Sequence, residues 1–363
     1  MAPRYFYYLV FINAMLNVIQ YVPSVLINAR FDGAIIACLL SVFISTVLMY
    51  QVVKRLGEFP GEGLPELMKL YMPKAVSASI IVLCIGLWYT AGLCTLLGFT
   101  MLTVEYIDPS LSETVVMVTF LLVVLAVARM SSDSVLYGSE MLFVVNLPLV
   151  FFILFKALTG DGIRWDTMLD VLTHAHSWPP YNTFAATTFI LSGYINMVVF
   201  NRVFSTPIQT KWLPWIIVPT CMGVVLTTFL IPFLYHGTVT IDRYLFPWIM
   251  TADAIRMDFF LVERLMFIFL LVYVSISLIS ISIHWHVGLE FAKSLLPYRE
   301  GSKLSSYSIG GVLVLFGTIA LCLVPLNSLQ IEDFNIAFQL VRLPGECFIL
   351  LVILYLQKKR RSL

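Results

Sequence analysis

Long apolar runs separated by short polar segments recur along the whole chain. Most runs hold about 18 or more residues with few charges, the length that an α-helix needs to cross the hydrocarbon core of a bilayer. The pattern predicts ten membrane-spanning helices, over residues 5–27, 33–53, 76–104, 112–129, 136–158, 182–203, 212–236, 264–286, 308–326 and 335–357. We therefore expect an all-α polytopic membrane protein whose residues 1–363 form a single integral membrane domain in the lipid bilayer.

The first of these runs carries a stripe of polar side chains. They recur at steps of three or four residues, so an α-helix places them on one face: Asn13, Asn17, Gln20, Ser24 and Asn28. Side-chain amides are costly in hydrocarbon unless they find partners, so this face should meet protein or water. Pro23 lies in the same run and predicts a break, because proline lacks an N–H and clashes with the preceding turn. The stripe either forms hydrogen bonds between neighbouring helices or is part of a binding site.

The sixth run is interrupted as well. Thr188, Ser192 and Asn196 share a face there, and Gly193 permits the helix to unwind between them. Two interrupted spans that stand five helices apart are typical of transporters built from inverted repeats, whose ligands bind near the middle of the membrane. The pattern predicts a LeuT-like five-plus-five inverted repeat in which helices 1 and 6 are broken.

The predicted ligand site lies at these two breaks. Side-chain amides, hydroxyls and freed backbone groups there would hold the ammonium and carboxylate of a small polar ligand. We expect the cavity to be lined by Asn17, Gln20, Tyr21, Gly193, Tyr194, Asn196 and Ser277. Ser277 belongs to a polar stripe in the eighth run, although a serine hydroxyl also finds a partner on the preceding turn of its own helix.

Few charges lie within the runs. Glu263 and Arg264 stand at the outer mouth of the eighth run, and Arg342 and Glu346 stand one helical turn apart in the tenth. The Arg342–Glu346 pair either neutralises itself locally or, like Glu263 and Arg264, serves as a gate or a coupling-ion site.

Composition and charge agree with a membrane protein of defined orientation. Hydrophobic residues make up 60% of the chain and charged residues only 12%, far below the roughly 25% of soluble domains. With the N-terminus inside, fifteen of the 22 Lys and Arg residues fall on the cytoplasmic side, and five fall outside. This bias predicts that both termini are cytoplasmic, so that the number of spans is even.

Other kinds of chemistry leave no signature. All six cysteines fall inside predicted spans, where isolated cysteines behave as small hydrophobes, so we expect neither disulfides nor a metal cluster. His284 and His286 flank Trp285 at a predicted inner boundary, which favours an interfacial position over a metal site. No phosphate loop, nucleophile elbow or metalloprotease motif is present. We expect a protein that is not an enzyme and has no cofactor, metal or nucleic-acid partner.

Two loops contain predicted surface elements. Prolines and glycines break the loop after the second run, and Pro65 begins a short amphipathic segment that we expect on the cytoplasmic surface. The outer loop over residues 159–181 is polar and too short for a separate domain, and it holds at most a surface helix.

Several short motifs carry a family resemblance. The segment Arg30-Phe31-Asp32-Gly33-Ala34 resembles an Ala-Gly-x-Asp-Gly loop, and residues 59–66, Phe-Pro-Gly-Glu-Gly-Leu-Pro-Glu, are similar to Phe-Pro-Gly-x-x-Leu-x-Glu. Gly193-Tyr194, Phe246-Pro247 and Val262-Glu263-Arg264 resemble the Gly-Tyr-Glu, Phe-Pro and Ile-Glu-Arg of the same family, in the same order. The chain thus resembles the B subunits of GerA-type spore germination receptors, a branch of the amino acid–polyamine–organocation transporter superfamily.

The resemblance implies a function and a location. It implies a membrane-embedded subunit that senses a nutrient (a germinant such as an amino acid), works with other germination receptor subunits, and resides in a bacterial cell membrane, the spore inner membrane. The chain departs from the family where Ile195 replaces a glutamate, where Met266 replaces an aspartate, and where bulkier residues replace a Gly-x-Gly in the first helix. The alternative is an ion-coupled secondary amino-acid transporter (a permease), which needs an ion-coordinating group exposed alternately to both sides.

Overall fold

The computed structural model describes residues 3–160, 162–256, 264–296 and 303–362, and of residues 303–306 it describes the backbone alone. The chain is 82% helical, and the described residues form no strand. An all-α architecture is therefore confirmed. Glu263, one of the predicted gate residues, lies outside the described residues.

Within the described part of the chain, six helices are long and apolar enough to cross a membrane. They are α3 (Ala34–Leu56), α5 (Lys74–Tyr106), α7 (Ser132–Thr159), α11 (Leu213–Thr240), α13 (Leu265–Leu295) and α15 (Ser328–Arg361). Two bent assemblies raise the number to eight if each is one span. The shorter apolar helices α6 (Glu113–Ala128) and α14 (Lys303–Cys322) coincide with the predicted fourth and ninth spans. The architecture is that of an integral membrane protein.

The two bent assemblies are the predicted first and sixth spans. In the first, α1 (Arg4–Asn17) meets α2 (Tyr21–Asn28) at 59°. In the sixth, α9 (Tyr181–Ile190) is followed at 64° by the short segments η1 (Ser192–Asn196), α10 (Met197–Phe200) and η2 (Asn201–Val203). Both interruptions predicted from the sequence are confirmed as bends.

The first bend falls three residues before the proline that predicts it. Pro23 is the third residue of α2, and the break occupies residues 18–20. The proline ring clashes with the carbonyl four residues back, at Ile19, so a continuous helix must be interrupted on the N-terminal side of Pro23. Proline is also well tolerated in the first turn of a helix, where its missing N–H would have no partner.

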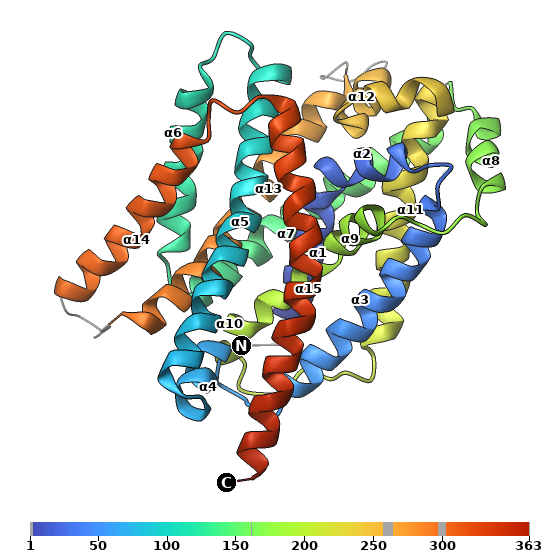
Figure 1. Cartoon of the computed structure of the whole chain (residues 1–363). Helices are drawn as coiled ribbons and strands as arrows, with labels where there is room; N and C mark the ends of the chain where they lie inside the picture. The colour runs from blue at the N-terminus through green and yellow to red at the C-terminus, as the bar shows by residue number, and fades with distance from the viewer. Residues whose placement is uncertain (1–2, 161, 257–263, 297–302, 363) are drawn as a thin grey trace.

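Helices α5 and α13 pack along each other at the centre of the molecule (Figure 1). Gly92 of α5 permits this contact, because a Cβ there would lie 2.5 Å from the ring of Trp285 on α13. The Trp285 indole N–H donates to the backbone carbonyl of Tyr89 at 3.1 Å. Helices α6 and α14 lie at the periphery next to this pair, and α3 and α11 pack together on the opposite side (Figure 1).

Short helices cover both ends of the bundle. At the end where the chain termini lie is α4 (Leu64–Tyr71), whose first turn is capped by Glu66 accepting from the Gly63 N–H at 3.0 Å (Figure 1). This is the short amphipathic helix predicted from Pro65. At the opposite end lie α8 (Trp165–Thr173), η3 (Ile241–Arg243) and α12 (Pro247–Ala254) (Figure 1).

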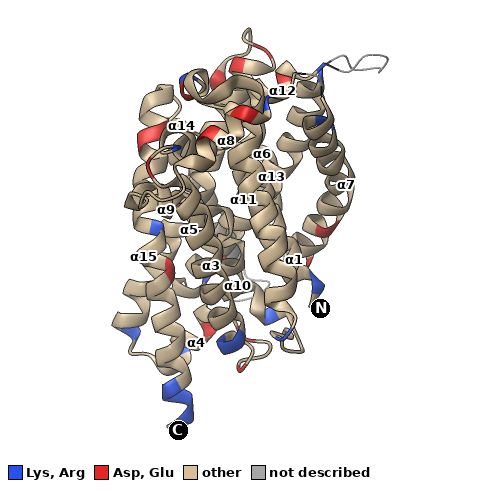
Figure 2. Ribbon diagram, turned by 90° about the vertical axis from the view of Figure 1, so that its right-hand side faces the viewer, with Lys and Arg blue, Asp and Glu red and all other residues tan. Residues whose placement is uncertain are grey.

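Charged residues gather at the two ends of the bundle. Figure 2 shows Lys and Arg concentrated at the end that carries both termini, and Asp and Glu mainly at the other. Termini at the same end agree with an even number of spans.

The last turn of α15 is bonded to the loop after α3 by hydrogen bonds from Gln357 and Arg361 to the Glu58 carboxylate. These hydrogen bonds, that from Gln357 above all, lower the pKa of the Glu58 carboxyl group.

Candidate ligand site at the two helix breaks

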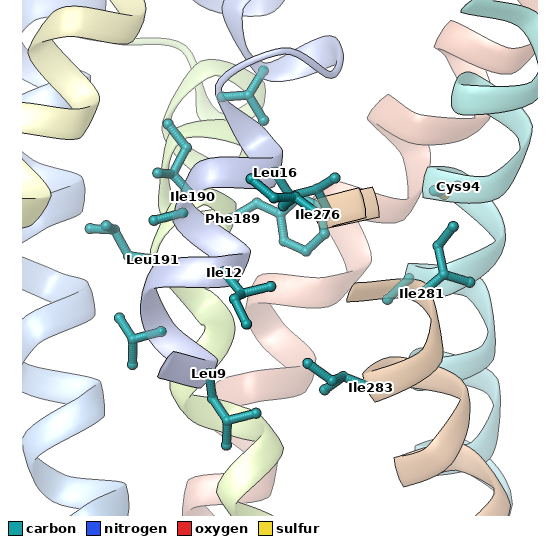
Figure 3. Close-up of a cluster of buried hydrophobic side chains, with 14 of the residues drawn as sticks. Leu9, Ile12, Leu16, Cys94, Phe189, Ile190, Leu191, Ile276, Ile281 and Ile283 are labelled. Atoms are coloured by element: carbon teal, nitrogen blue, oxygen red, sulfur yellow. The ribbon is translucent and has the colours of Figure 1, made fainter. Parts of the chain in front are cut away.

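The two broken spans cross in backbone contact at Gly193. A Cβ at this position would lie 2.3 Å from the Leu9 carbonyl oxygen and 2.9 Å from the Val10 Cα of α1. Figure 3 shows Leu9, Ile12 and Leu16 of α1 beside side chains of the sixth span. Gly193 was predicted to line the ligand cavity, and in the structure its lack of a side chain permits the close approach of α1 to η1.

Asn13 ties the two breaks together. Its amide nitrogen donates to the Phe189 carbonyl at 2.8 Å and to the Ile190 carbonyl at 3.1 Å. Helix α9 ends at Ile190, so these carbonyls have lost their partners within the helix. Asn13 thus replaces hydrogen bonds that the break removes. It belongs to the predicted polar stripe, although the predicted cavity lining did not include it.

Helix α13, the predicted eighth span, forms a hydrogen bond to the end of α1 at the first break. Tyr273 of α13 donates from its hydroxyl to the Met15 carbonyl at 2.7 Å. Within α1, the Asn17 amide nitrogen donates to the Asn13 carbonyl at 2.9 Å. The Tyr273 bond satisfies a carbonyl of the last turn of α1, which the break leaves without its helical partner, whereas Asn17 bonds a carbonyl one turn further back in the same helix.

Several polar atoms around the first break are buried and have no hydrogen-bond partner among the residues that the structure describes. They are Asn13 Oδ1, Asn17 Oδ1, Gln20 Nε2, the Tyr21 hydroxyl and Ser277 Oγ. The amide nitrogens of Asn13 and Asn17 both face carbonyls, which only accept, so the oxygens of these amides are the unpartnered atoms. A buried polar atom without a partner costs about 1–3 kcal/mol. Four of the seven predicted cavity residues carry such an atom.

These atoms belong to three elements that meet at the break. The Tyr21 ring packs against Phe246 with 5.6 Å between ring centroids, and a Cβ on Gly98 of α5 would lie 3.0 Å from it. Ser277 stands one turn after Tyr273, the residue of α13 that bonds the end of α1. Tyr21 is thus packed between α5 and Phe246, and Ser277 lies on the helix that bonds the last turn of α1.

Tyr194 and Asn196 were also predicted to line the cavity, and both have protein partners. The Tyr194 hydroxyl donates to Glu346 at 2.9 Å. Asn196 accepts from the Trp88 indole N–H at 2.7 Å and donates to the Gly193 carbonyl at 3.2 Å. These two residues join η1 to α15 and to α5. Trp88 lies in an uninterrupted apolar run, and nothing in the sequence marks it as the partner of Asn196.

Arg342 and Glu346 form the predicted local pair and also reach beyond it. Their side chains meet at 2.5 Å and are buried. Arg342 further donates to the Ala185 carbonyl at 2.8 Å and to the Thr188 hydroxyl at 2.7 Å. The pair thus fixes α15 against both halves of the broken sixth span. A cavity of about 30 Å³, enough for one or two water molecules, adjoins the pair and is also lined by His284.

The remaining predicted charges and histidines lie elsewhere. Arg264 is exposed and pairs with Asp253 of α12 at 3.0 Å, so it lies at the surface of the end opposite the chain termini. His284 and His286, predicted at an inner boundary, are both buried in α13, and His286 bonds the Ala128 carbonyl at the end of α6 at 2.9 Å. His284 bonds the Ser280 carbonyl one turn back at 2.8 Å, which lets the imidazole be buried without a partner from another helix.

The end of the sixth span near the chain termini is strongly bonded. The Asn201 amide donates to the carbonyls of Phe59 at 2.7 Å, Glu62 at 2.8 Å and Leu56 at 3.2 Å. Arg202 pairs with Glu66 of α4 at 2.9 Å and with Glu290 of α13. We call Asn201, Arg202 and these partners the inner clasp. The clasp joins η2 to the loop after α3, to α4 and to α13.

The arrangement can bind a ligand that offers both donors and acceptors. Two buried amide oxygens stand ready to accept, while an amide nitrogen and two hydroxyls can donate. Comparison of the chain with models of known protein families and with curated protein sequences gave no match.

Proposed function

We propose that this protein binds a small polar ligand, such as an amino acid, between its two broken spans and signals its presence. The observation that carries the proposal is the group of buried, unpartnered polar atoms on Asn17, Gln20, Tyr21 and Ser277. Native proteins satisfy nearly all buried polar groups, so a cluster of exceptions needs an explanation. A ligand that hydrogen-bonds to these atoms removes the cost of leaving them unpaired.

The unpartnered atoms include both hydrogen-bond acceptors and donors, as a zwitterionic ligand requires. The amide oxygens of Asn13 and Asn17 would accept from an ammonium group, next to the C-terminus of α1, where the helix dipole is negative. The Gln20 amide nitrogen and the Tyr21 hydroxyl would donate to a carboxylate at the N-terminus of α2, where the dipole is positive. Broken helices that bind opposite charges with their opposed ends are the usual site of inverted-repeat transporters.

Packing relations support a five-plus-five repeat of ten spans. Counting α6 and α14 as spans gives two sets of five, and contacts between helices recur when each partner is shifted by five spans. The contact of α3 with α9 matches that of α11 with α2, and α7 against α1 matches α15 against α9. Likewise, α13 against α7 matches α5 against α15. Helices α4 and α12 occupy equivalent positions, before the third and the eighth span, and lie at opposite ends of the molecule (Figure 1). An inverted repeat requires that opposition.

The resemblance to B subunits of spore germination receptors suggests what the ligand does. On that basis the ligand is a nutrient, partner subunits read out its binding, and the chain resides in the spore inner membrane. Binding shifts the population of conformations only if one conformation has the higher affinity, and no net transport is needed.

The rival is an ion-coupled amino-acid permease. A coupling site needs an ionisable group that can be exposed to either side. The deeply buried charges among the described residues, Arg342 and Glu346, bond each other as well as Tyr194 and Thr188. That arrangement uses them to hold helices together and favours the sensing function.

A binding experiment tests the site. The full chain in lipid nanodiscs is titrated with radiolabelled amino acids, singly and in pools. Asn17→Ala and Ser277→Ala should each weaken binding by roughly five- to a hundred-fold, the effect of about 1–3 kcal/mol. Asn335→Ala and Ser282→Ala are matched controls, because both side chains are buried and bond a carbonyl of their own helix. Equal effects in both sets would show that the unpartnered atoms are not ligand contacts.

A transport experiment separates the two functions. The purified chain is reconstituted in liposomes, and uptake of a labelled amino acid that it binds is followed under imposed H⁺ and Na⁺ gradients. Binding without concentrative uptake, together with loss of germination when the gene is deleted from a spore-forming host, is the expected result. Concentrative uptake by the chain alone would overturn the sensor proposal in favour of the permease.

A further inference from the structure

A large apolar cavity lies on the other side of the first break from the proposed ligand site. Its volume is about 720 Å³, within the range of roughly 300–1,000 Å³ of small-molecule sites. Its walls come from α1, α7, α11 and α13, and Trp248 of α12 closes one end. Interiors of proteins are close-packed and rarely contain voids larger than a water molecule, so a cavity of this size indicates an occupant.

The walls offer a ligand almost no hydrogen bonds. The hydroxyls of Thr220 and Thr227 both donate at 2.8 Å to carbonyls of their own helix. The Tyr273 hydroxyl is bonded to Met15, and the Trp248 N–H donates to the Thr228 carbonyl at 3.1 Å. The other lining side chains are apolar. Water and polar solutes would find no partners here, whereas a hydrocarbon needs none.

The cavity opens toward the bilayer. Its rim includes Phe151 of α7, 63% exposed, and Ile216 of α11, 42% exposed. These residues continue the exposed apolar surface of the two helices, which includes Val144, Phe155 and Trp215. Helices α7 and α11 both line the cavity but do not pack closely against each other. The opening between them therefore faces lipid chains.

The deep end of the cavity reaches the hinge of the first span. Phe11, Met15 and Val18 follow one another at steps of four and three residues, line the cavity and are only partly buried, whereas Leu16 and Ile19 are buried. Val18 is the first residue of the break, and the Met15 carbonyl accepts the hydrogen bond that holds α1 to α13. An occupant of the cavity would touch the hinge directly.

We propose that the acyl chain of a membrane lipid enters between α7 and α11, fills this cavity and packs against the break of the first span. The site goes beyond the proposed polar-ligand site and does not depend on it. Burial of hydrocarbon against Met15 and Val18 stabilises the bent arrangement seen here. Acyl-chain length and saturation would thus influence the movement of the hinge.

Photochemical labelling tests the proposal. The full chain is placed in phosphatidylcholine nanodiscs that contain a small fraction of lipid with a diazirine at the end of one acyl chain, illuminated and mapped by mass spectrometry. Adducts are expected on Met15 and Val18 and not on their buried neighbours Leu16 and Ile19. The proposal would be overturned if the lipid labelled Met15 and Val18 no more than Leu16 and Ile19. It would also be overturned if a water-soluble diazirine labelled Met15 and Val18 more strongly than the lipid does.

A variant at the mouth of the cavity provides a second test in the same labelling experiment. Gly223 lines the cavity, is exposed, and has no atom within 4 Å of a Cβ built on it, so Gly223→Phe can be accommodated and obstructs the opening. It should lower the labelling of Met15 and Val18 by about tenfold, because the phenyl ring competes with the acyl chain for the opening. Gly86→Phe is the control, because Gly86 is equally open and exposed on α5, away from the cavity. Unchanged labelling in folded Gly223→Phe would contradict the proposal. If that variant does not fold, the comparison of the two neighbouring pairs in the natural chain decides the question.

Discussion

Removing the carboxylate of Glu346 should destabilise the protein strongly. In Glu346→Ala, the Arg342 guanidinium stays buried with no counter-charge, since its other partners, the Ala185 carbonyl and the Thr188 hydroxyl, are neutral. Breaking a buried ion pair by removing one partner costs about 3–5 kcal/mol. The Tyr194 hydroxyl loses its acceptor as well. We expect a loss of about 4 kcal/mol in the free energy of unfolding.

The double variant should be more stable than either single one. Replacing both charges, in Arg342→Met with Glu346→Met, removes the unpaired charge and retains side-chain volume. The remaining cost is chiefly the unpartnered Tyr194 hydroxyl, about 1–3 kcal/mol. Isosteric hydrophobic replacement of a whole buried ion pair is often neutral or better, which supports this ordering.

Reversible unfolding in mixed detergent micelles measures these free energies. Asp333→Ala is the control, because Asp333 is exposed on the same helix and its loss should stay within about 0.5 kcal/mol. The reasoning is refuted if Glu346→Ala costs less than about 1 kcal/mol, or if the losses of the single variants Arg342→Met and Glu346→Met add in the double variant. Either result would mean that the charge pair does not hold α15 to the sixth span.

Three further variants probe the breaks and the end of the bundle near the termini. Gly193→Ala should cost about 3 kcal/mol of unfolding free energy, because its Cβ would collide with the α1 backbone, whereas Gly86→Ala, where a Cβ meets open space, should be tolerated. Asn13→Ala removes one hydrogen bond from each of two carbonyls at the end of α9, of which only that of Phe189 keeps a side-chain donor, the Ser192 hydroxyl. It should cost about 2 kcal/mol, more than Asn335→Ala in the same unfolding assay. The pKa of Glu58 is lowered, so its carboxylate should stay ionised and bond the end of α15 at pH values above the ordinary carboxyl range. As the pH falls below that range, the carboxylate takes up a proton and should release the end of α15. Spin-label distances between the two segments should show this release, and Glu58→Gln should abolish its pH dependence.

Local pattern was enough to find the broken spans. The polar stripe and Pro23 predict the first interruption, and Gly193 with its polar neighbours predicts the second, because both signals lie within a few helical turns. The local Arg342–Glu346 pair was predicted for the same reason. Its contacts with the sixth span were not, since they join residues more than 150 positions apart.

The residues predicted to line the site differ in their hydrogen bonding. Asn17, Gln20, Tyr21 and Ser277 share the property that matters, a buried polar atom without a partner. The sequence could not separate them from Tyr194 and Asn196, whose partners come from other helices. Whether a polar side chain awaits a ligand depends on the packing of distant helices, which periodicity does not encode. The sequence does not predict the apolar cavity either, because a helix face that lines a cavity has the same composition as a face that packs against another helix.

The inner clasp sets an energy threshold for the molecule. Opening that end would break the hydrogen bonds of Asn201, each worth about 0.5–1.5 kcal/mol, and the two ion pairs of Arg202, each worth up to about 1 kcal/mol. A ligand that binds at millimolar concentration releases about 4 kcal/mol in total, and only the difference in its affinity between two conformations can drive a change. Such a ligand can tighten the breaks without releasing the clasp. The contacts of the clasp together amount to a similar free energy, so a ligand of this affinity would have to bind the open conformation almost exclusively to release the clasp without help from a partner protein or an ion gradient.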